Sequence, residues 1–277
     1  MLRVRIKNVI LELLYTVIDG IEILRKSSMS SIKKYPNTIC TNDLIILGNG
    51  KSLMDVKFTH DIHQEFMVVN RAVFAPNYCE LRPRYYVVAD PLFWKGENGI
   101  NAIKAINEKT TWDMIFFAPN SSRKGLSPLI TSPNIRLVFF NTTRFRGLKP
   151  LRNWLYIHQM AMPAVINVIV AAIMNGILLN HKNIYLYGVE HSWISQMYVG
   201  DDNQVYLNDT HYYDQGKNNV RIWLDPDTGK SFPMSRLLKD LGNLFAEYVE
   251  INEFARNMCG VNIYNKTRGS FIDAFPR

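Results

Sequence analysis

Several short apolar runs in this chain end in glycine or polar residues of kinds that bind ligands. The run Leu44–Leu47 leads directly into the turn Gly48–Leu53, whose sequence is GNGKSL. Glycines let a backbone approach a ligand closely, and the N–H groups of such a turn can hold a phosphate. The spacing fits neither the GxGxxG nor the GxxxxGKS/T pattern of phosphate-binding turns. It is therefore typical either of a plain tight turn or of a nucleotide site formed by Gly48, Asn49, Gly50 and Ser52.

Two more apolar runs end in side chains that a nucleotide site would need. Asn70 follows the run that ends at Val69, and Asp90 follows the run that ends at Ala89. The Asn70 amide can hydrogen-bond a base or a sugar, and the Asp90 carboxylate can accept hydrogen bonds from ribose hydroxyls. Either side chain could instead cap its own turn, which is an ordinary role for Asn and Asp. We favour binding, because the ends of parallel strands converge at one edge of a sheet, where ligands bind.

A further group of polar residues follows the apolar run Ile184–Tyr187. It begins with Glu190 and His191 and continues with tyrosines and one histidine: Tyr198, Tyr206, His211, Tyr212 and Tyr213. A phenol can stabilise a departing phosphate, and an imidazole can accept a proton near neutral pH. Loop histidines and tyrosines are also common as plain surface residues. Neither an HExxH nor a DxD pattern accompanies the histidines, so we expect no metal and no cofactor.

The elements that must position these residues alternate between strand and helix. Helical spacing of apolar residues predicts helices over Ala164–Leu179 and Ser235–Met258. Short apolar runs bounded by turn residues predict strands. Those strands are Leu44–Leu47, Phe66–Val69, Tyr85–Ala89, Met114–Ala118, Leu137–Phe140, Ile184–Tyr187 and Val261–Tyr264. This order predicts an α/β fold with a Rossmann-like, mostly parallel sheet. The segment over about 190–233 is rich in Gly, Asp, Asn, Tyr and Trp, as is typical of a lid or binding loop.

The first 34 residues have a different pattern from the rest. Apolar residues recur at helical spacing from Val9 to Leu24, and basic residues flank them. Acidic residues interrupt the stretch, so it is neither a membrane-spanning helix nor a signal peptide. We expect either an interfacial helix attracted to anionic lipid, or a helix packed on the protein's own core or in a dimer. The expected organisation is an amphipathic segment over residues 1–40, followed by one Rossmann-like, nucleotide-binding catalytic domain over 41–277.

Composition limits the class of protein and its partners. The chain has 277 residues, 47% of them hydrophobic, which is enough for a large core. Its formal net charge of +8 favours an anionic partner. The basic residues form no long run and no nucleic-acid-binding motif, so we expect no nucleic acid. The three cysteines lie far apart in the sequence, which fits a reducing compartment.

These motifs, taken together, resemble the bacterial sialyltransferases of glycosyltransferase family 42. Members open a Rossmann-like, GT-A-like sheet with a strand and a GNGPSL turn, matched here by the turn Gly48–Leu53. They carry an Asn at the second strand end, as Asn70 here, and an Asn-Pro at the third, where this chain has Asp90-Pro91. The helix after Ala164 and the strand Ile184–Glu190 are also similar. The resemblance covers roughly residues 43–265.

The resemblance implies roles for the lid. In that family, lid tyrosines hold the phosphate of CMP and a lid histidine deprotonates the acceptor. By position this implies Tyr198 at the phosphate and His211 as the base, with His191 as its rival; Tyr212, beside His211, is expected to contact the substrate. The family's Thr-Ser-Gly before the central helix, which contacts sialic acid, is replaced by Met162-Pro163-Ala164. This departure puts the sialic acid donor in doubt more than the nucleotide-binding fold.

The C-terminal segment Ile263–Asp273 is instead similar to the ending of DUF115 proteins, which are related to hydroxymethylpterin pyrophosphokinases. The resemblance to the sialyltransferases implies a glycosyltransferase that uses a CMP-linked sugar and a glycan acceptor, and the amphipathic first segment is expected to hold it at the inner face of the cell membrane. The expected sugar is a sialic acid-like nonulosonate or Kdo, and the expected reaction is inverting and metal-independent. The alternatives are a pyrophosphokinase that uses ATP and Mg²⁺, and a non-catalytic membrane-bound adaptor. A homo-oligomer is possible under each of them.

Overall fold

The computed structural model describes residues 2–26, 42–58, 62–208, 220–222, 224–225 and 228–277. Its centre is a seven-stranded sheet in the order β10-β6-β1-β2-β3-β4-β5, in which every pair of neighbours is parallel. The strands are β1 (Asp43–Leu47), β2 (Gln64–Val69), β3 (Tyr85–Val87), β4 (Met114–Pro119), β5 (Ile135–Phe140), β6 (Asn183–Tyr187) and β10 (Asn262–Asn265). The α/β fold with a parallel sheet is confirmed, and all seven predicted strands are present.

The strand order creates a switch point beside β1. The chain moves outward from β1 to β5 and then returns to place β6 on the other side of β1. In open parallel sheets a crevice forms at such a point, outside the carboxyl ends of the strands. The fold therefore provides a ligand-binding edge next to the turn that follows β1.

Both faces of the sheet are covered, because the central strands are apolar on both sides. Leu44 and Ile46 of β1 enter one core, while Ile45 and Leu47 enter the other. The first core lies against α7 (Val168–Leu178), α8 (Met234–Phe254) and α6 (Lys149–Ile157). The second lies against the helices on the opposite face, chiefly α4 (Glu97–Lys109) with the short α2 (Tyr78–Leu81), α3 (Leu92–Lys95) and α5 (Arg123–Leu126).

Two predicted helices have different ends in the structure. Helix α7 begins at Val168 rather than Ala164, because the Asn167 side chain accepts a hydrogen bond from the Ile169 N–H and so starts the helix. Helix α8 ends at Phe254 and is followed by a π-turn, Ala255–Cys259. Gly260 then stops the helical chain with a φ of 65°, a conformation that glycine adopts easily.

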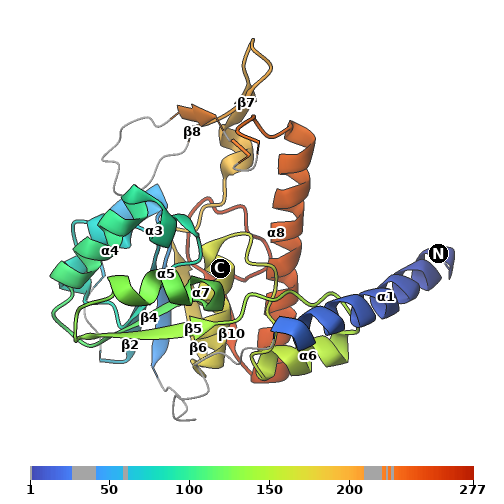
Figure 1. Cartoon of the computed structure of the whole chain (residues 1–277), viewed down its shortest axis with the longest axis horizontal. Helices are drawn as coiled ribbons and strands as arrows, with labels where there is room; N and C mark the ends of the chain where they lie inside the picture. Colours follow the sequence, from blue (N-terminus) through green and yellow to red (C-terminus); the bar gives the residue numbers. More distant parts are fainter. Residues whose placement is uncertain (1, 27–41, 59–61, 209–219, 223, 226–227) are drawn as a thin grey trace.

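The lid contains more regular structure than the sequence predicted. Between His191 and Pro233 lie the short 3-10 helix η6 (Trp193–Gln196) and a three-stranded antiparallel sheet. Its strands are β7 (Met197–Val199), β8 (Val205–Asn208) and β9 (Val220–Ile222). Figure 1 shows β7 and β8 projecting above the body, near one end of α8.

Helix α1 (Leu2–Lys26) leaves the body beside α6, with the N-terminus at its far end (Figure 1). It is attached near its C-terminal end: the buried Asp19 carboxylate accepts hydrogen bonds from the Arg146 backbone and guanidinium, and Ile23 enters the first core. Burial opposes ionisation of Asp19, but the hydrogen bonds and charge of Arg146 hold its pKa below the ordinary value. The helix therefore does pack on the protein's own domain. Within the described residues no helix is both long and apolar enough to cross a bilayer.

The C-terminal segment holds the loop that follows β6. Thr267 Oγ1 accepts a hydrogen bond from Val189 N at 3.1 Å, and Ser270 Oγ donates to Val189 O at 2.7 Å. Phe271 N donates to Glu190 O at 2.8 Å. This segment thus fixes the residues that follow β6 at the ligand-binding edge.

Candidate active site

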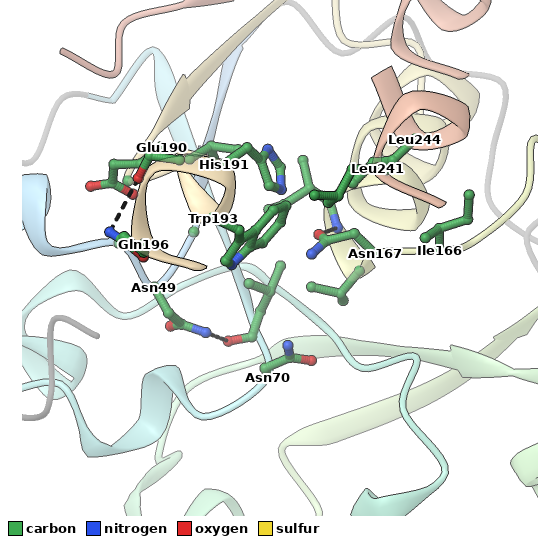
Figure 2. A pocket seen from close by; sticks show the side chains of 18 of the residues that line it. Asn49, Asn70, Ile166, Asn167, Glu190, His191, Trp193, Gln196, Leu241 and Leu244 are labelled. Atoms are coloured by element: carbon green, nitrogen blue, oxygen red, sulfur yellow. Dashed lines mark hydrogen bonds between the residues drawn. The ribbon is translucent and has the colours of Figure 1, made fainter. Parts of the chain in front are cut away.

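A pocket of about 440 Å³ lies at the carboxyl edge of the sheet, at the switch point. It is formed by the residues that follow β1, β2, β3 and β6, the N-terminal end of α7, one side of α8, and the lid. Seven of the residues predicted from the sequence line it: Gly48, Asn49, Gly50, Asn70, Asp90, Glu190 and His191. Figure 2 shows Asn49 and Asn70 on one side and Asn167, Leu241 and Leu244 on another, with Trp193 between them.

The glycine turn after β1 is packed tightly against the loop after β6. Gly48 N donates to Tyr187 O at 2.8 Å, and Gly50 N donates to Gly188 O at 2.9 Å, so the β1–β6 pairing continues into the turn. A Cβ on Gly48 would lie 2.1 Å from Gly188 O. Two of the N–H groups that the sequence suggested for phosphate are therefore used within the protein, and Gly48 is required by this contact.

Glu190 occupies the end of the turn where an anion would otherwise fit. Its Oε1 accepts a hydrogen bond from Ser52 N at 2.8 Å, at the start of the short 3-10 helix η2 (Lys51–Asp55). A Cβ on Gly50 would lie 1.4 Å from Glu190 Oε2. Because a carboxylate already covers this helix end, a phosphate here would meet a negative charge at short range. Ser52, which the sequence also predicted for the site, is not among the residues that line the pocket, and its Oγ is buried without a hydrogen-bond partner.

Three side chains from successive strand ends present amide or carboxylate groups to the pocket. Asn49 Nδ2 donates to Val69 O at 3.2 Å, which ties the β1 turn to the end of β2. Asn70 has a φ of 51°, and its Oδ1 is buried without a hydrogen-bond partner. Asp90 Oδ1 accepts from Leu92 N at 2.9 Å, so this carboxylate does cap its turn. An unpaired buried amide oxygen is costly, and a turn of the Asn70 side chain that brings this oxygen to a hydrogen-bond donor of a bound ligand would remove that cost.

The start of α7 forms the opposite wall. Ile166, Asn167, Val168 and Ile169 line the pocket there, and Asn167 caps the helix. The partial positive charge of a helix N-terminus favours a negatively charged ligand group. Leu241 and Leu244 of α8, with Val168 and Leu207, make this half of the pocket apolar.

His191 is a buried wall residue rather than an exposed base. Its side chain lies 4.4 Å from the Trp193 ring, centre to centre, and its Nε2 is 3.4 Å from the Tyr248 hydroxyl. Its Nδ1 is buried without a hydrogen-bond partner. Burial lowers the pKa of His191 to about 3. The imidazole is therefore neutral at physiological pH and is a weak proton acceptor.

The remaining predicted lid residues lie elsewhere. Tyr198 is on β7, half exposed and stacked on Tyr206 at 5.4 Å between ring centres, and it is not among the residues that line the pocket. His211 and Tyr212 lie outside the described residues. From the lid, the pocket is instead lined by Ser192, Trp193, Gln196, Leu207 and Arg221.

Sequence reasoning missed part of the lining. Asn167 could have been found, since an Asn directly before a long apolar helix is a cap signal. The indole of Trp193 follows a predicted site histidine and offers a flat apolar surface, but Trp alone does not distinguish a pocket from a core. Arg221, Leu241 and Leu244 come from distant segments, and no spacing in the sequence links them to the turn after β1.

The arrangement suits an elongated, partly polar ligand. One half offers amides, a carboxylate and a lysine, Lys51, while the other half offers an indole, aliphatic side chains and a helix N-terminus. Binding sites for sugars commonly combine polar groups with an aromatic ring that packs against one face of the sugar. In the described part of the chain, no three His, Cys, Asp or Glu side chains are grouped as a metal site requires.

Similar solved structures include three sialyltransferase structures from Campylobacter jejuni. The sialyltransferase CstII, in complex with the substrate analogue cytidine-5'-monophosphate, is 14% identical with a TM-score of 0.44, covering 85% of this chain and 84% of its own. The monofunctional α-2,3-sialyltransferase Cst-I is 16% identical with a TM-score of 0.46, and the match covers 87% of this chain and 82% of Cst-I. An α-2,3-sialyltransferase in apo form is 15% identical with a TM-score of 0.42, and the match covers 86% of this chain and 80% of that enzyme. No protein-family model and no curated protein matches the sequence.

Proposed function

We propose that the chain is a glycosyltransferase that moves a sugar from a CMP-linked donor to a glycan acceptor. One observation carries the proposal: the separate motifs that resemble the sialyltransferase family line one pocket. Gly48–Gly50, Asn70, Asp90 and Glu190 come from four strand ends and surround the same cavity at the switch point of the sheet.

The geometry supports a division of this pocket between the two parts of the donor. Asn49, Asn70 and Asp90 are suited to the nucleoside, because they offer donors and acceptors at the ends of β1 to β3. Gly48 and Gly50 pack closely against Gly188 and Glu190, so the turn that carries them does not extend into that region. The Ser52 backbone N–H holds the Glu190 carboxylate in place. Since Glu190 blocks the η2 end, the donor phosphate would face the start of α7 and Arg221.

The proposed chemistry is a single inverting displacement. The acceptor hydroxyl loses its proton to a base and its oxygen attacks the anomeric carbon, while the bond from that carbon to the phosphate oxygen breaks and CMP leaves. His211 is the proposed base, and the low pKa of His191 supports this choice over its rival. Tyr198 and Tyr212 would stabilise the departing phosphate without a metal, after the lid has moved Tyr198 from its present stack on Tyr206.

The proposed setting is the synthesis of surface polysaccharide or lipopolysaccharide at the inner face of the cell membrane, with a sialic acid-like nonulosonate or Kdo as the sugar. The apolar half of the pocket, with Trp193, supports a sugar that carries apolar substituents or stacks one ring face.

A thermal-shift panel of CMP, CDP, UDP and ATP with Mg²⁺ tests the proposal. CMP should raise the melting temperature in the presence of EDTA, because a ligand that binds the folded state stabilises it. A shift with ATP and Mg²⁺ alone would instead favour a pyrophosphokinase. No shift with any nucleotide would favour a non-catalytic adaptor.

A further inference from the structure

Helix α1 is attached to the domain by one side and carries a broad apolar face on the other. The side that faces the domain holds Thr16, whose Oγ1 accepts from Leu148 N at 2.9 Å, together with Asp19 and Ile23. The Arg146 guanidinium lies 4.1 Å from the centre of the Tyr15 ring. These contacts fix the rotation of the helix about its own axis.

Because that rotation is fixed, the apolar face points away from the protein. At about 3.6 residues per turn, seven large apolar residues fall on the side away from Thr16, Asp19 and Ile23, whereas Val9 lies in line with Thr16 and Ile23. All seven are exposed to solvent, from 46% for Ile21 to 76% for Leu24. They are Ile10, Leu13, Leu14, Val17, Ile18, Ile21 and Leu24, and we call them the outward face.

Helix α6 adds to the exposed apolar surface. It lies beside α1 in Figure 1, and the hydrogen bond from Leu148 to Thr16 joins its start to α1. Its Leu151, Trp154 and Ile157 are spaced three residues apart and are 39%, 48% and 41% exposed. So many exposed large apolar residues on two neighbouring helices are uncommon on a monomeric soluble protein and indicate an interaction site.

The charges favour a lipid surface as the occupant. Among the described side chains of α1, the acidic residues Glu12, Asp19 and Glu22 all lie outside the outward face by helical spacing. Arg25, which is exposed, falls between Leu14 and Ile18 within this face, and Glu22, at one border of it, is paired with Lys26. A face in which the charged member of the described side chains is basic matches an anionic bilayer, and an exposed tryptophan such as Trp154 suits the boundary between headgroups and acyl chains.

The width of the outward face argues against a second copy of the chain. It spans more than a third of the helix circumference, whereas a two-helix seam uses only the narrower stripe of two positions in seven. We therefore propose that α1 and the exposed side of α6 form a docking surface that lies in the headgroup region of an anionic membrane. This inference does not depend on the proposed reaction.

Vesicle flotation of the full chain tests it, with phosphatidylcholine vesicles and with vesicles that also contain phosphatidylglycerol. The wild type should float with the mixed vesicles and bind them less at high salt. Leu13→Glu/Val17→Glu should weaken binding by at least about tenfold, since it places two charges on the inserted face. The matched control is Leu92→Glu/Leu238→Glu, which changes two residues of similar exposure on α3 and α8 and should bind as the wild type does.

Trp154→Glu should also weaken binding to the mixed vesicles if α1 and α6 together form the docking surface. Unchanged binding of this variant would show that α1 alone forms it. Sedimentation velocity without lipid tests the other occupant. A dimer that Leu13→Glu/Val17→Glu dissociates, in a protein that does not float, would overturn the proposal. Equal loss in the control pair, or no flotation of the wild type, would also overturn it.

Discussion

The two glycines of the turn after β1 should respond very differently to alanine. In Gly48→Ala the new Cβ meets a backbone oxygen, Gly188 O, at 2.1 Å. In Gly50→Ala the Cβ meets the Glu190 carboxylate, at 1.4 Å from Oε2. A backbone strand cannot move away without breaking the sheet, whereas the end of a glutamate side chain can rotate. Although its Cβ overlaps more, Gly50→Ala should therefore lower the unfolding free energy less than Gly48→Ala does.

The magnitudes follow from what each substitution breaks. Gly48→Ala must separate the turn from β6 and so loses the hydrogen bonds Gly48 N to Tyr187 O and Gly50 N to Gly188 O. Overpacking costs about 1–3 kcal/mol, and each lost hydrogen bond adds about 1 kcal/mol. The expected loss of unfolding free energy is about 3–5 kcal/mol. Gly50→Ala gives up chiefly the hydrogen bond from Ser52 N to Glu190, so about 1–2 kcal/mol is expected.

Urea denaturation of the wild type and five variants measures both costs: each glycine variant, Glu190→Ala, and each glycine variant combined with Glu190→Ala. In a Glu190→Ala background the carboxylate is gone, so Gly50→Ala should cost almost nothing there, which gives a coupling energy of about 1–2 kcal/mol. Gly48→Ala should keep its full cost in that background. Equal costs for the two glycines, or a Gly50→Ala cost that Glu190→Ala leaves unchanged, would refute the assignment of Gly50 to packing against Glu190.

Three further results are expected. Asp19→Asn should lower the unfolding free energy by roughly 1–3 kcal/mol in urea denaturation at pH 7, because Arg146 loses its charged partner. Since the pKa of Asp19 is lowered in the folded state, the difference in unfolding free energy between the variant and the wild type should vanish as the pH falls through that pKa. A difference that stays constant with pH would contradict the ion pair. The pKa of His191, about 3, lies below its unfolded value near 6.5, so wild-type stability should fall by up to about 1.4 kcal/mol per pH unit as the pH drops between these values. His191→Asn, which tolerates the φ of 49°, should remove this slope, and an unchanged slope would show that another group is responsible. His211→Ala should lower turnover by about 10²–10⁴-fold in a transfer assay with CMP release while leaving CMP affinity nearly unchanged, and normal turnover would exclude it as the base.

The sequence was most informative where local chemistry decides the structure. Buried strands such as Leu44–Leu47 are apolar on both faces and end in obvious turns, so their existence could be predicted directly. Convergence of Asn49, Asn70 and Asp90 on one edge then followed from parallel pairing, which brings carboxyl ends together.

Contacts between segments that are distant in the sequence could not be predicted from local sequence patterns. The glycines were expected to leave room for a ligand, yet Gly48 and Gly50 leave room for Gly188 and Glu190, which are far away in the sequence. The sequence predicted a lid or binding loop without strands. Strands β7 to β9 are three or four residues long, which is too short for their periodicity to be recognised in the sequence. Helix α1 packs on the domain through its polar side while its apolar face stays exposed, which no helical pattern alone could indicate, and its binding to lipid stays a prediction.

Calorimetric titration of CMP into the wild type and Asn70→Gly tests the central claim, that this pocket binds the nucleotide. Asn70 has a positive φ that glycine adopts without strain, so the substitution removes the unpaired amide while leaving the backbone in place. We expect CMP to bind the wild type and to bind Asn70→Gly at least about tenfold more weakly, with the melting temperature of the free protein little changed. Equal CMP affinity in the two proteins, or no heat of binding in the wild type, would contradict the account.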